Sequence, residues 1–549
     1  MNQYITTTLS DILYLLIVLG LGYFIGKYIY KYIYLGQKIK FISKVIDPIQ
    51  NGILKLAGAG KNNEMRPKTY FINILVFSLI GFFMLFILLL VQGDLFLNPN
   101  KVKNMNAEQA FNTAISFVTN TNWQSYKGEI DLTYLSQTLG LTTQNFLSAG
   151  VGISVLFVLI RGLTGKGTKL VGNFYLDLIR INLYLLIPLS IVGAVLLLSQ
   201  GVPQTYSQNV PYNSISGNSG NSSTLYLGPV ASQVIIKLLG SNGGGFYGAN
   251  SAYPYENPTT FSNMLQSISI LLIPVSLCYT FGFAVKDKKQ GYMLLQAMTF
   301  IFILALILCT LSEFTQGSMN GKESRFGIGE SSFWSVATTA TSNGSSNSNI
   351  SDTSSLGTLV LIILMELGEV VYGGVGSGLY GMIAFVILTI FISGLMIGKT
   401  PEYLGKKIDS IDMKMVCLLI LPPPILSIIG TAIGIGVEKV DNTPKGFTGI
   451  LYTFTSLANN NGSSFSTFNS NTTYTNVFGG FIMAICRFVP IGAVIKISSN
   501  SFNKKVVAES QNSLKTSTPL FASLLVGVAI LIGALGFFPS WALGPIAGW

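Results

Sequence analysis

Four clusters of small polar residues, each between a weakly apolar segment and a long apolar run, are the sequence's best candidates for chemistry. They combine asparagine, serine or threonine with glycine or a second asparagine, and glycine and asparagine adopt left-handed backbone most readily. Such backbone can turn carbonyl oxygens toward one axis, and a ring of these oxygens, a selectivity filter, replaces the water shell of a dehydrated cation. The candidate residues are Asn120, Thr121 and Asn122; Ser241, Asn242 and Gly243; Ser342, Asn343 and Gly344; and Asn460, Asn461 and Gly462.

The clusters are spaced as an internal repeat. The successive separations are 121, 101 and 118 residues, counted between Asn122, Gly243, Gly344 and Gly462. Each follows a segment too short to cross about 30 Å of hydrocarbon, because a dozen helical residues reach only about 18 Å. These segments are 107–118, 229–239, 332–339 and 447–457. An isolated Asn-Gly is typical of a surface turn, but four in this context predict re-entrant loops that line a cavity.

The short segments also indicate the sign of the ligand. As helices they would direct their partly negative C-terminal ends at the clusters, which favours a cation over phosphate or carboxylate. Asn122 stands where the other clusters have glycine, so the ring is predicted to be asymmetric on that side. Gln124 is predicted to lie just above the first loop.

The composition places these loops in a membrane protein. Of 549 residues, 49% are hydrophobic and only 10% charged, against about 25% charged in an average soluble chain. The absence of histidine removes the usual imidazole base, metal ligand and pH switch. The four cysteines lie singly in apolar runs, so they are interpreted as packing residues.

Ten apolar runs are long enough to cross the bilayer, and the first is interpreted as a retained helix rather than a signal peptide. They cover residues 10–30, 69–92, 143–161, 172–199, 261–285, 291–313, 357–397, 415–437, 473–497 and 519–539. Alternate loops collect 24 of the 33 lysines and arginines, and the opposite loops hold eight. The positive-inside rule makes the basic loops cytoplasmic and puts both termini outside. The net charge of +11 therefore reflects membrane orientation, not nucleic-acid binding.

The seventh run has 41 residues, about 60 Å as one helix, and is predicted to break. The break is expected at four glycines, Gly373, Gly374, Gly376 and Gly378. There they would form a flexible loop beneath the filter that gates ion exit. The alternative is that the glycines only allow close helix packing.

Four charges lie within or near apolar runs, namely Glu366, Glu369, Lys399 and Arg487. A charge in the bilayer is costly unless paired or hydrated, so its default interpretation is functional. Arg487 is predicted either to pair with Glu366 or Glu369 or to act as a positive barrier below the filter. Lys399 is a second pathway candidate, although the positive-inside rule explains it equally well.

Longer strings around these residues resemble the potassium-binding A subunit of the bacterial Kdp potassium pump. The strings are Thr119-Asn120-Thr121-Asn122-Trp123-Gln124-Ser125-Tyr126, Asn242-Gly243-Gly244-Gly245-Phe246-Tyr247 with Asn250-Ser251-Ala252, Gly373-Gly374-Val375-Gly376-Ser377-Gly378-Leu379-Tyr380-Gly381 and Lys399-Thr400-Pro401-Glu402-Tyr403-Leu404-Gly405-Lys406-Lys407. The resemblance implies a subunit of the bacterial cell membrane that takes K⁺ from outside through a four-loop filter. It also implies three partners: a P-type ATPase catalytic subunit, which hydrolyses ATP, and two small accessory membrane subunits.

The chain itself is not expected to be an enzyme. It has no Asp-Lys-Thr-Gly phosphorylation string and no phosphate-binding loop of the Gly-x4-Gly-Lys-Ser/Thr type. A dinucleotide fingerprint starting at Gly376 lacks the strand-turn-helix context, so no organic cofactor is expected. The resemblance implies K⁺ as the transported ion. The alternative function is a self-sufficient potassium channel or cation symporter of the related Trk/Ktr type, which would have the same filter chemistry.

The expected fold class is an all-α polytopic membrane protein with about ten transmembrane helices. Four pseudo-repeats of helix, re-entrant pore loop and helix surround a potassium-channel-like pore, and additional helices flank them in 1–34 and 517–549. The repeats cover 69–162, 172–286, 290–398 (with a broken second helix) and 414–498.

Overall fold

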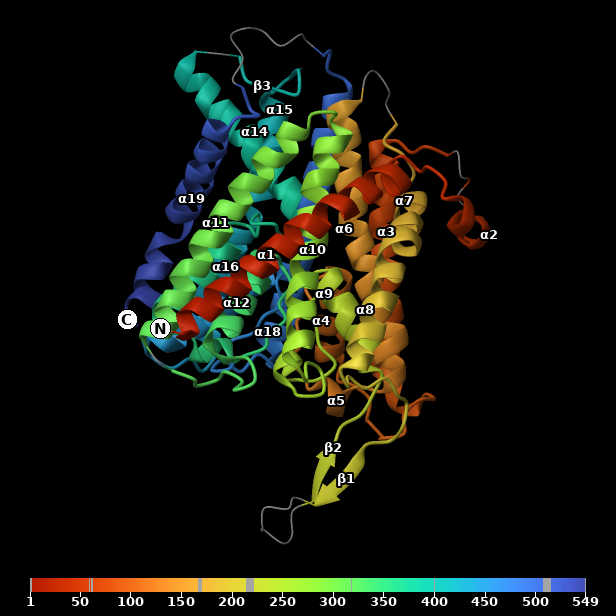
Figure 1. The fold of residues 1–549 in the computed structure, drawn as a ribbon, viewed down its shortest axis with the longest axis vertical. Helices are drawn as coiled ribbons and strands as arrows, with labels where there is room; N and C mark the ends of the chain where they lie inside the picture. Colours follow the sequence, from red (N-terminus) through yellow and green to blue (C-terminus); the bar gives the residue numbers. More distant parts are fainter. Residues whose placement is uncertain are drawn as a thin grey trace.

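The computed structural model describes residues 2–58, 60, 63–165, 170–213, 222–316, 318–398, 400–506 and 515–548. Within this part of the chain, ten helical segments are long and apolar enough to cross a membrane, which confirms the all-α polytopic class. Most of them run roughly along the long axis of the molecule, whereas the first of them crosses the bundle obliquely (Figure 1). They comprise α1 (Asn2–Tyr28) with η1 (Ile29–Tyr34), α3 (Pro67–Val91) with η2 (Gln92–Asp94), η3 (Ser136–Thr142) with α6 (Thr143–Thr164), α7 (Phe174–Ile181) with η4 (Asn182–Leu186) and α8 (Ile187–Ser199), α10 (Thr260–Ala284), α11 (Lys288–Thr315), α14 (Ser377–Ile397), α15 (Ser410–Ile420) with α16 (Pro422–Val437), α18 (Thr473–Phe502), and α19 (Pro519–Trp541) with η7 (Ala542–Ile546).

The spanning segments differ in how much of their surface the protein itself covers. The most apolar windows of the η3–α6 and α10 segments are 83% and 89% buried, whereas those of the α1 and α3 segments are only 22% buried. Helices α6 and α10 therefore lie in the core of the bundle, and α1 and α3 expose apolar surface at its edge. At the start of α10 a capping box satisfies the first amides, since Thr259 and Ser262 each accept a hydrogen bond from the other's backbone N–H at 3.0 Å.

Four short buried helices precede the four polar clusters. They are α4 (Ala107–Val118), α9 (Val230–Leu239), α12 (Gly327–Ala340) and α17 (Pro444–Ala458). Helix α12 begins five residues before the predicted segment, because its polar first turn finds partners on other helices. The Glu330 carboxylate accepts hydrogen bonds from the Tyr14 hydroxyl on α1 (3.0 Å) and from Asn263 Nδ2 on α10 (2.9 Å).

The seventh apolar run is divided into two helices. Ten residues separate the end of helix α13 (Ser355–Glu366) from the start of α14 at Ser377. Five of the ten intervening residues have positive φ, including the non-glycine residues Glu369 (48°) and Tyr372 (63°). A helix cannot continue through such backbone, so α14 alone is long enough to count as the span.

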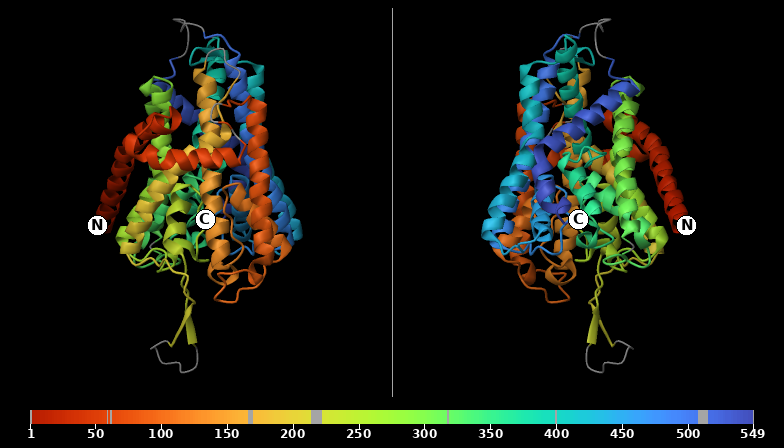
Figure 2. Two further views of the ribbon diagram at one scale, coloured as in Figure 1. Left: turned by 90° about the vertical axis from the view of Figure 1, so that its right-hand side faces the viewer. Right: turned by 90° about the vertical axis from the view of Figure 1, so that its left-hand side faces the viewer.

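Several elements outside the spanning bundle were not expected from the sequence. Helix α2 (Lys40–Leu56) lies across the long axis of the bundle (Figure 2) and exposes the apolar residues Val45, Ile49, Ile53 and Leu56. An antiparallel hairpin of β1 (Val210–Asn213) and β2 (Ser222–Leu225) projects from one end of the molecule (Figure 1). The smaller hairpin of β3 (Glu402–Tyr403) and β4 (Lys406–Lys407) lies at the other end. The remaining short helices are α5 (Gly128–Asp131), η5 (Asn250–Ala252) and η6 (Ile350–Asp352).

Candidate ion-binding site

The structure brings the four polar clusters together. They form the first loop (119–124), the second loop (240–246), the third loop (341–345) and the fourth loop (459–463). Consecutive loops touch through their glycines: a β-carbon at Gly243 would lie 1.6 Å from the carbonyl oxygen of Asn343. The equivalent approaches are 2.2 Å for Gly344 to the oxygen of Asn461 and 2.0 Å for Gly462 to the oxygen of Thr121. No side chain fits at these positions without displacing the neighbouring loop.

Contacts between the first and second loops close the ring. Asn120 Nδ2 donates to the carbonyl oxygen of Ser241 at 2.8 Å. A β-carbon at Gly244 would lie 3.0 Å from the β-carbon of Asn122, so the glycine next to Gly243 faces the residue that replaces glycine in the first loop. The asymmetry predicted at Asn122 therefore falls on this one junction.

The backbone of all four loops follows one pattern. The first and third candidate residues of each loop have positive φ, and the middle residue has ordinary negative φ. The values are 70° and 52° for Asn120 and Asn122, 49° and 82° for Ser241 and Gly243, 56° and 82° for Ser342 and Gly344, and 56° and 94° for Asn460 and Gly462. Backbone whose φ alternates in sign can turn successive carbonyl oxygens to the same side, which is the arrangement a dehydrated cation requires.

In each short helix, one carbonyl group near the C-terminus binds the middle residue of the loop that follows. The N–H of the middle loop residue donates to the carbonyl oxygen five residues earlier. The pairs are Thr121 to Ser116 (2.9 Å), Asn242 to Lys237 (2.8 Å), Asn343 to Thr338 (3.1 Å) and Asn461 to Ser456 (2.9 Å). Because the helix ends take up these amide hydrogens, the loops are left to present oxygen to a ligand, and the helix dipoles add negative potential.

Asparagine side chains connect neighbouring repeats. Asn343 Nδ2 in the third loop donates to the carbonyl oxygen of Lys237 on α9 at 2.9 Å. In the same way Asn461 Nδ2 in the fourth loop donates to the carbonyl oxygen of Thr338 on α12 at 3.0 Å. Both amides are fully buried and bound to protein, so they fix the loops relative to one another.

Gln124 lies between the first two loops rather than free above them. Its Nε2 donates to the carbonyl oxygen of Gly245 at 2.9 Å, and its Oε1 accepts from the Gly245 N–H at 3.0 Å. A primary amide that pairs with both backbone groups of one residue fixes that residue's orientation. Gln124 thus clamps the second loop to the first.

The glycines of the α13–α14 break lie against the third loop and the core helix α6. The Gly373 N–H donates to the carbonyl oxygen of Ala340 at 3.2 Å, and a β-carbon at Gly374 would lie 3.3 Å from that of Ser342. A β-carbon at Gly376 would lie 2.2 Å from the Gly152 carbonyl oxygen on α6. The glycine-rich backbone between α13 and α14 is therefore in close contact with both the third loop and α6.

Three of the four predicted charges border one small cavity of about 80 Å³ beside the third and fourth loops, lined by Ser342, Glu366, Glu369, Asn460 and Arg487 among others. Among the described residues Arg487 forms no ion pair, so the predicted pairing with a glutamate is not observed. Glu366 instead accepts hydrogen bonds from Trp541 Nε1 and from Thr455 Oγ1 (3.3 Å). Glu369 accepts one from Asn461 Nδ2 (2.8 Å). Lys399 lies outside the described residues.

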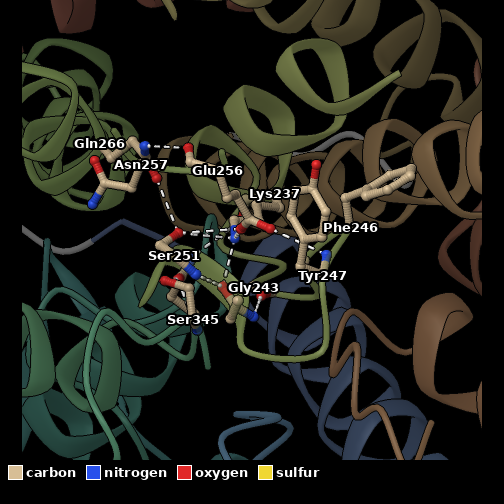
Figure 3. A network of polar contacts seen from close by, with 12 residues as sticks. Lys237, Gly243, Phe246, Tyr247, Ser251, Glu256, Asn257, Gln266 and Ser345 are labelled. Carbon is tan, nitrogen blue, oxygen red and sulfur yellow. Dashed lines mark hydrogen bonds and ion pairs between the residues drawn. The ribbon is translucent and has the colours of Figure 1, made fainter. Parts of the chain in front are cut away.

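One group of functional candidates was missed by sequence reasoning. Behind the second loop, Lys237 on α9 forms an ion pair with Glu256, and both side chains are fully buried (Figure 3). Lys237 is one of the eight lysines and arginines that the sequence assigns to the loops opposite the basic ones. The available signal was its place inside a short apolar helix, where a lysine is as unusual as the four charges that were selected.

Comparison with known proteins agrees with this architecture. Residues 12–549 match the family model described as "Potassium-transporting ATPase A subunit". The chain is 48% identical to the potassium-transporting ATPase potassium-binding subunit of Listeria monocytogenes serotype 4a (strain HCC23), over 98% of each chain. It is also 48% identical to the subunit of that name from Clostridium perfringens (strain ATCC 13124), over 97% of each. The crystal structure of the potassium transporter TrkH from Vibrio parahaemolyticus shares the fold, with a TM-score of 0.55, 14% identity and coverage of 89% of this chain and 97% of TrkH. The chain therefore belongs to the potassium-transporting ATPase A subunit family.

Proposed function

We propose that this protein is the potassium-binding, ion-selecting membrane subunit of an ATP-driven, high-affinity K⁺ import complex. The observation that carries the proposal is the closed ring of four loops in which φ alternates in sign in the same way. Four such loops supply rings of neutral carbonyl oxygens at fixed spacing, and these replace the hydration shell of a monovalent cation. The filter residues are the twelve candidate residues of the loops, with Gln124 as the clamp between the first two.

The rigidity of the ring supports a selective rather than a general cation site. The amide hydrogens of the middle residues are bound by helix carbonyls, and the side chains of Asn343 and Asn461 are bound by neighbouring repeats. Neutral carbonyl oxygens attract a cation less strongly than carboxylates do, so the ion can bind and still leave the site.

The cavity beside the third and fourth loops is proposed as the start of the ion's route after the filter. Glu366, Glu369 and Arg487 line it, with Arg487 as a positive barrier, and Lys399 is the second basic pathway residue. Gly378 lines this cavity and Gly376 packs against Gly152 of α6, and we propose the backbone at Gly373, Gly374, Gly376 and Gly378 as the gate. A K⁺ leak that is unchanged after the gate loop is shortened would remove that role.

The proposed complex lies in the bacterial plasma membrane, with both termini of this chain outside. Its further members are a P-type ATPase catalytic subunit, which hydrolyses ATP, and small accessory membrane subunits. The relatives carry the name of a potassium-binding subunit, not of the catalytic one, which supports a non-enzymatic role for this chain. K⁺ is the cargo.

Potassium titration of ATP hydrolysis by the co-purified complex tests the proposal. We expect hydrolysis to require this chain and to be stimulated by K⁺ but not by Na⁺. The alternative, a self-sufficient potassium channel or cation symporter of the Trk/Ktr type, predicts K⁺ flux through the chain reconstituted alone in vesicles. Flux by the isolated chain, together with potassium-independent hydrolysis by the complex, would favour the alternative.

A further inference from the structure

Lys237 occupies a position that repeats around the ring, and it is the only charged residue there. Lys237 stands six residues before Gly243, the third candidate residue of the second loop. The equivalent positions on the other three short helices are Ser116, Thr338 and Ser456. Those hydroxyls bind within their own loops; for example, Ser456 Oγ accepts from the Gly462 N–H at 3.0 Å. The second repeat therefore places an ammonium group where the others place a small neutral group.

The Lys237 side chain reaches behind the second loop into a polar network (Figure 3). Its ammonium group pairs with the Glu256 carboxylate and donates to Ser251 Oγ at 3.0 Å and to Asn250 Oδ1 at 2.5 Å. Glu256 also accepts from the Tyr247 N–H at 3.2 Å, so the network is attached to the backbone just beyond the loop. Every charge in this network is compensated within it.

Asn250 connects the ion pair to the ring. Because its Oδ1 accepts a hydrogen bond from the Lys237 ammonium group, its Nδ2 must face the other way, where it donates to the Gly243 carbonyl oxygen at 2.9 Å. Gly243 is the third residue of the second loop, and its amide is already bound to the carbonyl oxygen of Lys237 at 2.9 Å. Lys237 thus fixes Gly243 twice, through its own backbone and through Asn250.

A purely structural role does not account for a buried ion pair here. Well-packed apolar residues usually stabilise a protein as much as a buried pair does, since two ions lose their hydration on burial. The pair has a property that apolar residues lack: it orients the Asn250 amide, and with it a single carbonyl oxygen. The hydroxyl residues of the other repeats make no equivalent contact among the described hydrogen bonds.

We propose that the Lys237–Glu256 pair, acting through Asn250, is a positioning device that fixes the direction of the Gly243 carbonyl oxygen and so sets the discrimination between K⁺ and other alkali cations. The inference rests on the proposed filter function. Lys237, Glu256 and Asn250 are positioning residues, because they act on the ion through Gly243.

Two variants of the complete complex test this role. Asn250→Gly removes the donor while suiting the left-handed backbone at this position (φ 54°), so the loop retains its conformation. Glu256→Gln neutralises the carboxylate and exchanges one acceptor oxygen for an NH₂ group, which breaks the network's pattern of acceptors. Half-saturating concentrations of K⁺, Rb⁺ and Na⁺ for ATP hydrolysis are measured for each variant.

We expect both variants to raise the half-saturating K⁺ concentration about tenfold, the effect of losing one hydrogen bond to a charged network. The ratio of the Rb⁺ to the K⁺ concentration should change about threefold or more, while the maximal rate stays within about twofold. The matched control is Glu313→Gln, which alters the Glu313–Lys322 pair (2.7 Å, side chains 4% and 5% exposed). That pair has no hydrogen bond to a filter loop among the described residues, so all three values should match the wild type.

An unchanged Rb⁺/K⁺ ratio in both Asn250→Gly and Glu256→Gln overturns the positioning role, even if yield or maximal rate falls. Gly243→Ala separates this failure from a failure of the filter itself. If Gly243→Ala loses K⁺ affinity while the other two retain the wild-type ratio, the filter proposal stands and the positioning device does not. If Gly243→Ala binds K⁺ like the wild type, both proposals fall.

Discussion

The second and fourth loops share the same backbone, but different chemistry supports each of them from behind. In the fourth loop the hydroxyl of Tyr452, on the preceding helix, lies 2.7 Å from Ser463 Oγ. The third loop is built similarly, since Trp334 Nε1 donates to the Ser345 carbonyl oxygen at 3.0 Å. Both aromatic residues stand eleven positions before the serine they bind, so these two loops are supported by neutral groups of their own repeat.

The second loop lacks this aromatic support. Gln233 stands in the position of Trp334 and Tyr452, and its side-chain amide has no hydrogen-bond partner among the described residues. The Lys237–Glu256 pair supports the loop instead. The ring therefore requires one backbone conformation in every loop, whereas the groups that support each loop from behind differ.

The largest effect is expected where the two loops are alike. Gly243→Ala and Gly462→Ala each add a β-carbon at positive φ (82° and 94°) and within 2.0 Å of a neighbouring carbonyl oxygen. Strain and overpacking together cost about 2–5 kcal/mol. The half-saturating K⁺ concentration for ATP hydrolysis should rise at least about 30-fold in both. A large loss in one variant with none in the other would break the equivalence of the loops.

A smaller effect is expected from the clamp on the second loop, which has no counterpart at the fourth loop in the part of the chain that the structure describes. Gln124→Ala removes two hydrogen bonds to Gly245, worth about 1 kcal/mol each, and leaves the Gly245 backbone to be satisfied by water. Apparent K⁺ affinity in the same assay should weaken about tenfold while the complex still assembles. Wild-type affinity would mean that the second loop is held by the ion pair alone.

The neutral support of the fourth loop should matter less still. Tyr452→Phe removes the hydroxyl that binds Ser463 and keeps the ring, so it costs about 1 kcal/mol, or about fivefold in K⁺ affinity. Tyr474→Phe is the matched control, because its hydroxyl donates to the Gly430 carbonyl oxygen at 2.9 Å, away from the loops. An effect larger than that of Glu256→Gln would reverse the ranking of charged and neutral supports.

No effect on K⁺ affinity is expected at the opposite end of the molecule. Lys406 in β4 donates to the carbonyl oxygens of Gly162 (2.7 Å), Gly165 (2.8 Å) and Ser501 (2.9 Å) and so ties the ends of α6 and α18 together. Lys406→Met should lower the melting temperature by a few degrees, since hydrogen bonds to charged groups contribute about 1.5–3 kcal/mol. A change in K⁺ affinity would contradict the separation of this region from the ring.

The same residue gives a pH dependence. Burial and the neighbouring Lys504 lower the pKa of Lys406 from 10.5 to about 8. Between these values the unfolded chain binds more protons at this site, so the site's contribution to stability rises with pH. The difference in melting temperature between wild type and Lys406→Met should therefore widen from pH 8 to pH 10. A difference that narrows would show that the sign is wrong.

The membrane class, the ten spans and the four repeated loops can be predicted from the amino-acid sequence alone. These features are local: apolar runs of about 20 residues and short polar clusters leave the same signal wherever they lie in the fold. The equivalence of Asn122 with Gly243, Gly344 and Gly462 can also be predicted from the sequence, because glycine and asparagine are the residues that adopt positive φ most readily. The position of α2 cannot be, since a short amphipathic helix within a basic connection carries little hydropathy signal.

The contacts between side chains of different elements depend on the tertiary structure. Arg487 lies in a span that hydropathy identifies, yet whether it pairs with Glu366 or Glu369 depends on how α13, the α13–α14 connection and α18 pack around one cavity. The contact of Gly376 with Gly152 joins residues in different repeats. Lys237 is the clearest case, because its partners Asn250, Ser251 and Glu256 become its neighbours only when the chain turns back behind the second loop. The energetic effect of a buried charge depends on the group that pairs with it. Which group that is depends on how the chain packs, and a local sequence pattern does not show it.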